Sequence, residues 1–153
     1  MKRILLIIAA VLALSFGAYA APDLAVYVDG ELLQTEVQPV IINDRTMLPM
    51  RAVFEQLGAQ VDWIEEEKII IASKEGVFIS FKIDTDVMLV QDMSAGGEKE
   101  RVILDAPPTI VGESTMVPVR AVSEAFGSEV IWNAEDRAVQ IVTKPADDLE
   151  DKE

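Results

Sequence analysis

The sequence predicts an α+β fold in two tandem repeats, each a twisted antiparallel β-sheet wrapped around one short α-helix. Three observations predict it. Short stretches that alternate apolar and polar residues recur between turn residues, as is typical of hairpins, and two stretches with helical spacing interrupt them. The third observation is an internal repeat, because residues 39–72 align without a gap with residues 108–141 and are identical at 13 of 34 positions.

A signal peptide is predicted over residues 1–20. Two basic residues precede a nearly all-apolar stretch over residues 4–16, and Ala18-Tyr19-Ala20 is a small-x-small cleavage signal. The apolar stretch is shorter than the roughly 20 residues that a membrane span needs. We therefore expect a secreted protein, extracellular or associated with the cell surface, with no stable membrane anchor after signal cleavage.

The composition excludes several classes of function. The 153 residues include no histidine and no cysteine, so imidazole bases, imidazole metal ligands, disulfides and iron–sulfur clusters are ruled out. The formal net charge of −14 repels phosphate backbones and argues against a nucleic-acid partner. Half of the chain is apolar, which is enough for a packed core. We expect no cofactor, no metal and no catalytic residue set.

The first repeat is predicted to open with a hairpin. Residues 26–28 alternate, the Asp29-Gly30 pair favours a tight primed turn, and the chain returns over residues 31–37. In the second repeat the counterpart strands cover residues 87–90 and 101–104. The loop between them, from Gln91 to Glu100, is longer and is a candidate contact with a partner. Between the repeats, residues 77–83 alternate as one more amphipathic strand.

Each repeat is then predicted to contain one helix of about nine residues, a length that needs tertiary packing to persist. Pro49 and Pro118 suit the first helical turn, and Thr46 and Thr115 are candidate capping residues upstream.

The ends and buried faces of both helices are also predictable. Gly58 and Gly127 stand where a left-handed residue ends a helix. The apolar stripes expected to face the core are Met50, Val53, Phe54 and Leu57 in the first helix, and Val119, Val122 and Phe126 in the second, where Ser123 replaces the phenylalanine.

A second hairpin follows each helix, and each carries one tryptophan. Trp63 and Trp132 each share a strand face with a valine, which favours packing in the core; stacking on a sugar ring is the alternative.

An arginine near each helix start recurs with a glutamate four residues later. Arg51 precedes Glu55 and Arg120 precedes Glu124. Residues four apart are neighbours on a helix, so we favour a structural ion pair over anion recognition.

The recurring motif resembles a known family. Thr-Met-Leu-Pro-Met-Arg-Ala-Val over residues 46–53, followed by Leu57-Gly58-Ala59 and Val61-Asp62-Trp63, is similar to the repeat of the copper amine oxidase N-terminal domain, or stalk domain. The resemblance covers about residues 23–144 and occurs twice. It implies a twisted antiparallel sheet around one helix, and a non-catalytic extracellular module of the kind found in many secreted and cell-surface bacterial proteins.

The chain departs from the family pattern at the turn before each helix. Arg45 in the first repeat becomes Ser114 in the second, so whatever the arginine does, only the first repeat can do it. The usual Asn-Gly turn is Asn43-Asp44. Amine oxidase chemistry itself is excluded, because it needs histidine ligands for copper and a tyrosine-derived quinone, whereas this chain has no histidine and keeps only Tyr27 after signal removal.

Two acidic runs are candidate calcium ligands, Asp84-Thr85-Asp86 and residues 147–151. Neither has the spacing of an EF-hand loop, so we favour solvated charge. Residues 145–153 are predicted to form a disordered acidic tail.

The expected organisation is a signal peptide over residues 1–20, a first repeat over 21–83, a second over 84–144 and the tail. Each repeat is too small to be comfortably stable alone, so we expect the two to pack together. The leading functional hypothesis is a binding module for an extracellular protein, a cell-wall glycan or a second copy of itself. The rival is a small secreted hydrolase that uses paired carboxylates.

Overall fold

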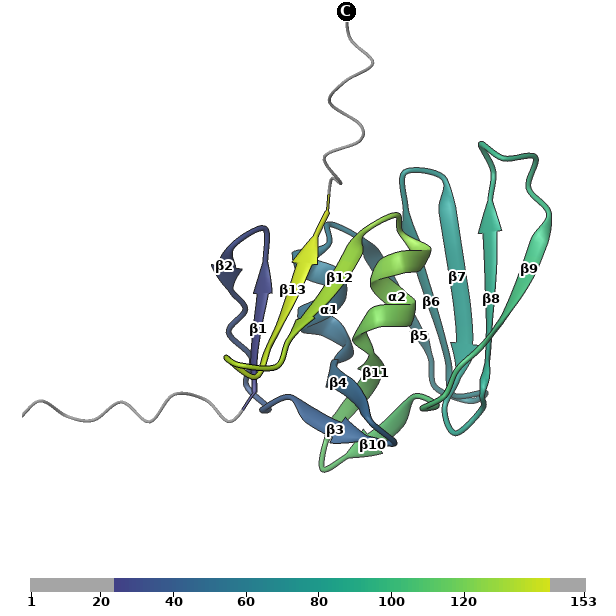
Figure 1. The fold of residues 1–153 in the computed structure, drawn as a ribbon. Coiled ribbons are helices and arrows are strands. Elements are labelled where there is room, and N and C mark those ends of the chain that lie inside the picture. The colour runs from purple at the N-terminus through teal and green to yellow at the C-terminus, as the bar shows by residue number, and fades with distance from the viewer. Residues whose placement is uncertain (1–23, 144–153) are drawn as a thin grey trace, which may run out of the picture.

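The structure, a computed structural model, describes residues 24–143 and has a mixed α+β architecture dominated by strands (Figure 1). The expected signal peptide and acidic tail lie outside the described residues. Within residues 24–143, no helix has the length and apolar character needed to cross a membrane.

The elements follow one another in two similar series. The first is β1 (Ala25–Val28), β2 (Glu31–Leu32), β3 (Val40–Ile42), β4 (Arg45–Pro49), α1 (Met50–Gln56), β5 (Gln60–Ile64) and β6 (Ile69–Lys74). Strand β7 (Val77–Lys82) comes next. The second series is β8 (Val87–Asp92), β9 (Lys99–Ile103), β10 (Thr109–Val111), β11 (Ser114–Pro118), α2 (Val119–Ala125), β12 (Glu129–Asn133) and β13 (Ala138–Val142). The elements from β3 to β6 recur in the same order as those from β10 to β13.

A central sheet in the order β10-β11-β4-β3 joins the two series. Strands β4 and β11 are antiparallel, and Leu48 pairs with Val117, the residue that occupies its aligned position in the second series. The two series are therefore related by an approximate two-fold axis at this pair. Because strand side chains alternate, Leu48 and Val117 enter the main core, while Met47 and Met116 form a small cluster with Ala106 on the other side.

The outer sheets mix strands from both series, which corrects the expectation of one separate sheet per repeat. One sheet has the order β12-β13-β1-β2 and the other β5-β6-β7-β8-β9. The hairpin that opens each series thus joins the sheet of the other series. Strand β1 also pairs in parallel with β13, where the sequence predicted antiparallel pairing throughout. Alternation patterns reveal strands but not their partners, so this exchange was not predictable.

Strand β7 makes the two outer sheets unequal. Hairpin β1–β2 lies directly beside β13, whereas β7 separates hairpin β8–β9 from β6. One intervening strand moves a neighbour outward by about 4.8 Å. Hairpin β8–β9 consequently lies one strand farther out than its counterpart.

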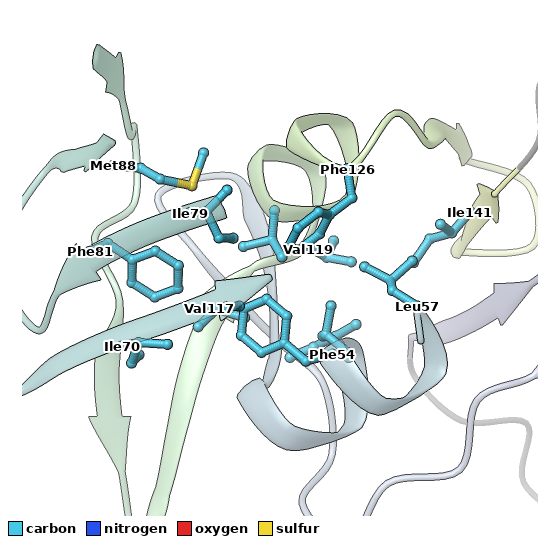
Figure 2. Packing of buried hydrophobic residues seen from close by; sticks show 14 of the residues in the cluster. Phe54, Leu57, Ile70, Ile79, Phe81, Met88, Val117, Val119, Phe126 and Ile141 are labelled. Atoms are coloured by element: carbon cyan, nitrogen blue, oxygen red, sulfur yellow. The ribbon is translucent and has the colours of Figure 1, made fainter. Parts of the chain in front are cut away.

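Both series contribute to one main core, which confirms that the two halves pack together. Phe54 of α1 is completely buried; it stacks on Phe81 of β7 at 6.5 Å between ring centroids and meets Phe126 edge-on at 6.2 Å. Figure 2 shows these rings among apolar side chains from the helices and the sheets.

The two helices begin differently from the prediction and have seven residues each. Pro49 and Pro118 are the N-cap residues with extended ψ values of 125° and 111°, and no side chain caps either helix. Thr46 and Thr115 lie inside β4 and β11 and are not caps. The strand continues directly into the helix because the fixed φ of proline suits both conformations.

The two helices end as predicted. Gly58 and Gly127 have φ values of +72° and +79°. At the first, the N–H of Gly58 donates to the carbonyl of Glu55 at 3.1 Å, and the N–H of Ala59 donates to that of Phe54 at 2.8 Å. This pair of bonds is a Schellman motif, and the same pair ends α2.

Candidate binding grooves beside the two helices

A hollow in the described part of the chain lies beside α2 and is called here the α2 groove. Its volume is about 590 Å³. One wall is the outer face of α2, and the opposite wall is made by β7, β8 and β9 and the segment after β9. The apolar lining includes Val77, Met88, Val90, Val102, Ile103, Leu104, Ala121 and Ala125.

Two ion pairs stand at one end of the α2 groove. The guanidinium of Arg45 binds Asp105, with Nε donating to Oδ2 at 3.0 Å, and so joins β4 to the segment after β9. Nε of Arg120 lies 3.8 Å from Oε1 of Glu124, which is the predicted pairing of residues four apart. All four side chains are about half exposed, so these pairs position the rim more than they stabilise the fold.

The tip of hairpin β8–β9 closes the other end. Oδ1 of Asp92 accepts hydrogen bonds from the hydroxyl of Ser94 at 2.6 Å, the N–H of Ser94 at 2.8 Å and the N–H of Ala95 at 3.3 Å. The hydroxyl bond, with help from the two backbone bonds, lowers the pKa of Asp92 and keeps it ionised. Glu100 adds a second carboxylate to this end.

Hydrogen bonds within the tip connect its residues, and the tip contains the predicted contact loop. Nε2 of Gln91 donates to the carbonyl of Gly97 at 2.7 Å, and the N–H of Gly97 donates to the carbonyl of Asp92 at 2.8 Å. Met93 is 57% exposed. The loop therefore exposes an apolar side chain on a backbone that is held by hydrogen bonds.

The matching groove beside α1 has a different chemistry. It has a volume of about 520 Å³ and is lined by the outer face of α1, residues 33–37, Trp63 and the turn at residues 113–115. Ser114 occupies the position of Arg45, and Glu36 that of Asp105, so the bridging ion pair is missing. Arg51 and Glu55 also form no ion pair with each other, which makes the predicted pairing wrong in this half.

The two tryptophans differ in burial. Trp63 is partly buried against the core, and its indole N–H donates to Oε2 of Glu65 at 3.2 Å. Trp132 is 43% exposed, so the prediction of core packing is wrong for it. Residues 33–37 line the same groove as Trp63, whereas their counterparts, residues 102–106, line the α2 groove, whose lining does not include Trp132.

Trp132 lines a third, smaller hollow, called here the Trp132 hollow. Its volume is about 240 Å³. The polar groups come from the turn between β3 and β4 and from the first turn of α2. Its lining is Ile41, Asp44, Arg45, Thr46, Val119, Arg120, Val130 and Trp132.

The acidic run at residues 84–86 serves the fold through its backbone. The N–H of Asp84 donates to the carbonyl of Pro108 at 2.8 Å, and the carbonyl of Asp86 accepts from the N–H of Leu104 at 2.7 Å. Across residues 24–143, no three acidic side chains gather in a way that would hold a metal ion.

Sequence reasoning found the repeated positions but missed the α2 groove. Pro49, Pro118, Gly58 and Gly127 shape the ends of the two helices, and Arg51 and Arg120 lie exposed on the outer helix faces. The groove depends on the place of β7 in the sheet, which no local motif encodes. The unmatched strand at residues 77–83 was the available signal.

Comparison with known proteins places the chain in a family. The copper amine oxidase N-terminal domain family matches residues 27–141, and the chain belongs to it. The resemblance seen in the sequence is thereby confirmed, and the family is one of non-catalytic stalk-type domains.

One particular relative is a Brevibacillus choshinensis protein named protease inhibitor. It is 30% identical to this chain over 129 residues, which cover 82% of the chain and 36% of the relative. The chain thus matches little more than a third of that protein.

Proposed function

We propose that the protein is a secreted, non-catalytic module that binds an extended segment of an extracellular protein in the α2 groove. The observation that carries the proposal is the groove itself, which combines an apolar lining with an open sheet edge. Strand β9 is the last strand of its sheet, and Ile103 is 63% exposed there. An edge strand offers backbone N–H and carbonyl groups with which an extended segment can pair.

The charged side chains at the α2 groove indicate which charge the bound segment should carry. Asp105 and Glu124 have arginine partners, whereas Asp92 and Glu100 form no ion pair within residues 24–143. The hydrogen bond from the Ser94 hydroxyl lowers the pKa of Asp92 and so further favours its charged form. We therefore infer a segment with apolar side chains and a lysine or arginine placed near these two carboxylates.

We also infer that the two halves arose by duplication of one unit. The shared order of elements in the two series supports this inference, as do the paired counterparts Leu48 and Val117. For the rival hydrolase, Asp92 is not a suitable general acid, since hydrogen bonds lower its pKa, whereas that role at neutral pH needs a raised one.

A display library of short random peptides tests the proposed groove. Selection on the immobilised mature protein is expected to enrich peptides that place a basic residue beside apolar ones. Glu100→Lys should weaken an enriched peptide by about tenfold, because a charge reversal replaces attraction by repulsion. Glu98→Lys is the matched control, as it makes the same charge change on the same hairpin outside the groove lining.

A second pair of variants tests the apolar part. Ala121→Phe fills the α2 groove and should reduce peptide affinity, while Ala52→Phe makes the same change at the counterpart position in α1 and should not. Circular dichroism verifies that both variants fold. A library that yields no enrichment, or peptides that bind Glu100→Lys and Ala121→Phe as tightly as the unmodified protein, would disprove the proposal.

A second candidate function is inhibition of a protease by the tip of hairpin β8–β9. The name of the Brevibacillus choshinensis relative favours it, together with the braced loop that exposes Met93. A panel of secreted bacterial proteases tests it. Inhibition that disappears in Met93→Asp but persists in Glu100→Lys would establish the loop as the inhibitory element, and full protease activity at a large excess of the protein would exclude it.

A further inference from the structure

We propose that the Trp132 hollow is a carbohydrate subsite, in which an uncharged sugar ring stacks on the indole of Trp132. This inference goes beyond the proposed function, because it assigns a different ligand class to a neighbouring hollow that shares Arg45, Thr46 and Arg120 with the α2 groove. It rests on three observations: an exposed tryptophan with an unused donor, a polar rim drawn from both halves of the chain, and the local balance of charge.

The first observation is the contrast between two counterpart tryptophans. The indole N–H of Trp63 is bonded to Glu65. At the position of Glu65 the second half has Ala134, which offers no side-chain acceptor. Within residues 24–143 the indole N–H of Trp132 has no hydrogen-bond partner in the protein, and 43% of the residue is exposed. Trp132 therefore presents both an apolar surface and a donor to the solvent.

The second observation is the rim of the hollow. Asp44 stands at the turn between β3 and β4, where Asn43 and Asp44 have φ values of +49° and +57°. Its carboxylate forms no hydrogen bond with any other described residue, so it is an available acceptor. Thr46 and Arg120 also line the hollow and supply a hydroxyl group and guanidinium donors.

These groups match the chemistry of a sugar ring. A pyranose has an apolar C–H face that packs on a flat aromatic side chain, and hydroxyl groups around its edge that need both donors and acceptors. The volume of about 240 Å³ lies below the range of about 300–1,000 Å³ typical of drug-sized ligands. The hollow thus suits one ring of a longer chain that extends into solvent.

The third observation, charge, favours an uncharged ring. Arg45 is already bound to Asp105, and Arg120 lies close to Glu124, so neither guanidinium is fully available to a carboxylate on the ligand. The whole chain carries a net charge of −14 and repels anionic polymers at low salt. An acidic glycan would therefore gain little in the hollow and would be repelled on approach.

The two tryptophans of the chain make a direct test possible. In Trp63→Phe, Trp132 is the sole tryptophan; in Trp132→Phe, Trp63 is. Each mature variant is titrated with N-acetylglucosamine hexamer, cellohexaose and, as the acidic arm, oligogalacturonate. We expect at least one neutral hexamer to change the emission of Trp63→Phe, and none to change that of Trp132→Phe.

Affinities measured by calorimetry complete the test. Trp132→Ala should lower the affinity for the neutral hexamer by about tenfold or more, since it removes the stacking surface. Asp44→Asn should weaken sugar binding by a smaller factor than Trp132→Ala. Asparagine adopts the left-handed conformation of this turn readily, so the backbone is expected to stay as it is. Glu100→Lys, which alters the α2 groove alone, should leave sugar binding unchanged.

Three results would overturn the proposal. They are the absence of binding by any neutral hexamer, affinity unchanged in a folded Trp132→Ala variant, and preferential binding of oligogalacturonate. Sugar binding that persists in Glu100→Lys and Ala121→Phe separates this subsite from the peptide groove, so either proposal can fail without the other.

Discussion

The α1 side and the α2 side of the molecule share a framework and differ in what surrounds it. Both sides run from strand into a seven-residue helix at a proline and leave the helix at a glycine with positive φ. Around α1, residues 33–37 share a polar groove with Trp63. Around α2, the inserted strand β7 displaces the equivalent segment and leaves an apolar groove and an exposed Trp132. Positions shared by the two sides hold the fold, and positions that differ shape the surfaces at which we propose binding.

The largest expected difference between the two sides concerns the core. Phe54 is completely buried between two other phenylalanines, whereas its counterpart is Ser123. Phe54→Ala should lower the free energy of unfolding by about 3–5 kcal/mol, because it removes a large side chain and leaves a cavity. Urea unfolding measures the loss. A loss below about 1 kcal/mol would mean that α1 does not anchor the shared core.

Replacing the glycine that ends each helix is expected to lower the free energy of unfolding by the same amount in both halves. Gly58→Ala and Gly127→Ala should each cost about 1–2 kcal/mol, because an L-residue pays that amount to adopt the left-handed conformation. No atom lies within 4 Å of an added Cβ at either site, so the cost is conformational alone. Thermal unfolding of both variants provides the comparison. Asn at either position is the control and should cost less, and a cost at only one site would contradict the equivalence of the two ends.

Substitution of two buried serines in the second half is expected to raise the free energy of unfolding, by less than the preceding substitutions lower it. The hydroxyl groups of Ser123 and Ser128 are buried and have no hydrogen-bond partner among the described residues. Ser128→Ala restores the residue found at the counterpart position Ala59, and Ser123→Ala removes the other unpaired hydroxyl. Each should raise the free energy of unfolding by about 1 kcal/mol in chemical denaturation. Destabilisation by either substitution would indicate that its hydroxyl is paired in solution.

The ion pair found only on the α2 side should have the smallest effect on stability. Arg45→Ser copies Ser114 and removes the bridge to Asp105, yet both side chains are about half exposed. The expected loss is below about 1 kcal/mol and should vanish at high salt. Arg51→Ser, at a residue with no ion pair within residues 24–143, is the control with no expected loss. A larger loss that does not depend on salt would show that the bridge is structurally essential.

Local patterns in the sequence predicted the parts of the fold that depend on neighbouring residues. The hairpins, both helices and the glycine ends follow from alternation, helical spacing and the conformational freedom of glycine. The exchange of hairpins between sheets and the position of β7 depend on long-range pairing, which alternation does not specify. The same limit hid the α2 groove. The exposure of Trp132 was missed because a valine on the same strand face does not indicate whether another element of the fold covers that face.

The central claim is that two interlocked halves form one cooperative body around a shared core. Urea unfolding of Trp63→Phe and Trp132→Phe tests it most directly, because the remaining tryptophan reports on one half at a time. We expect the two variants to have coincident midpoints and slopes, after any change of overall stability caused by each substitution, measured by circular dichroism, has been subtracted. Two separate transitions, with one half unfolding while the other stays folded, would contradict it.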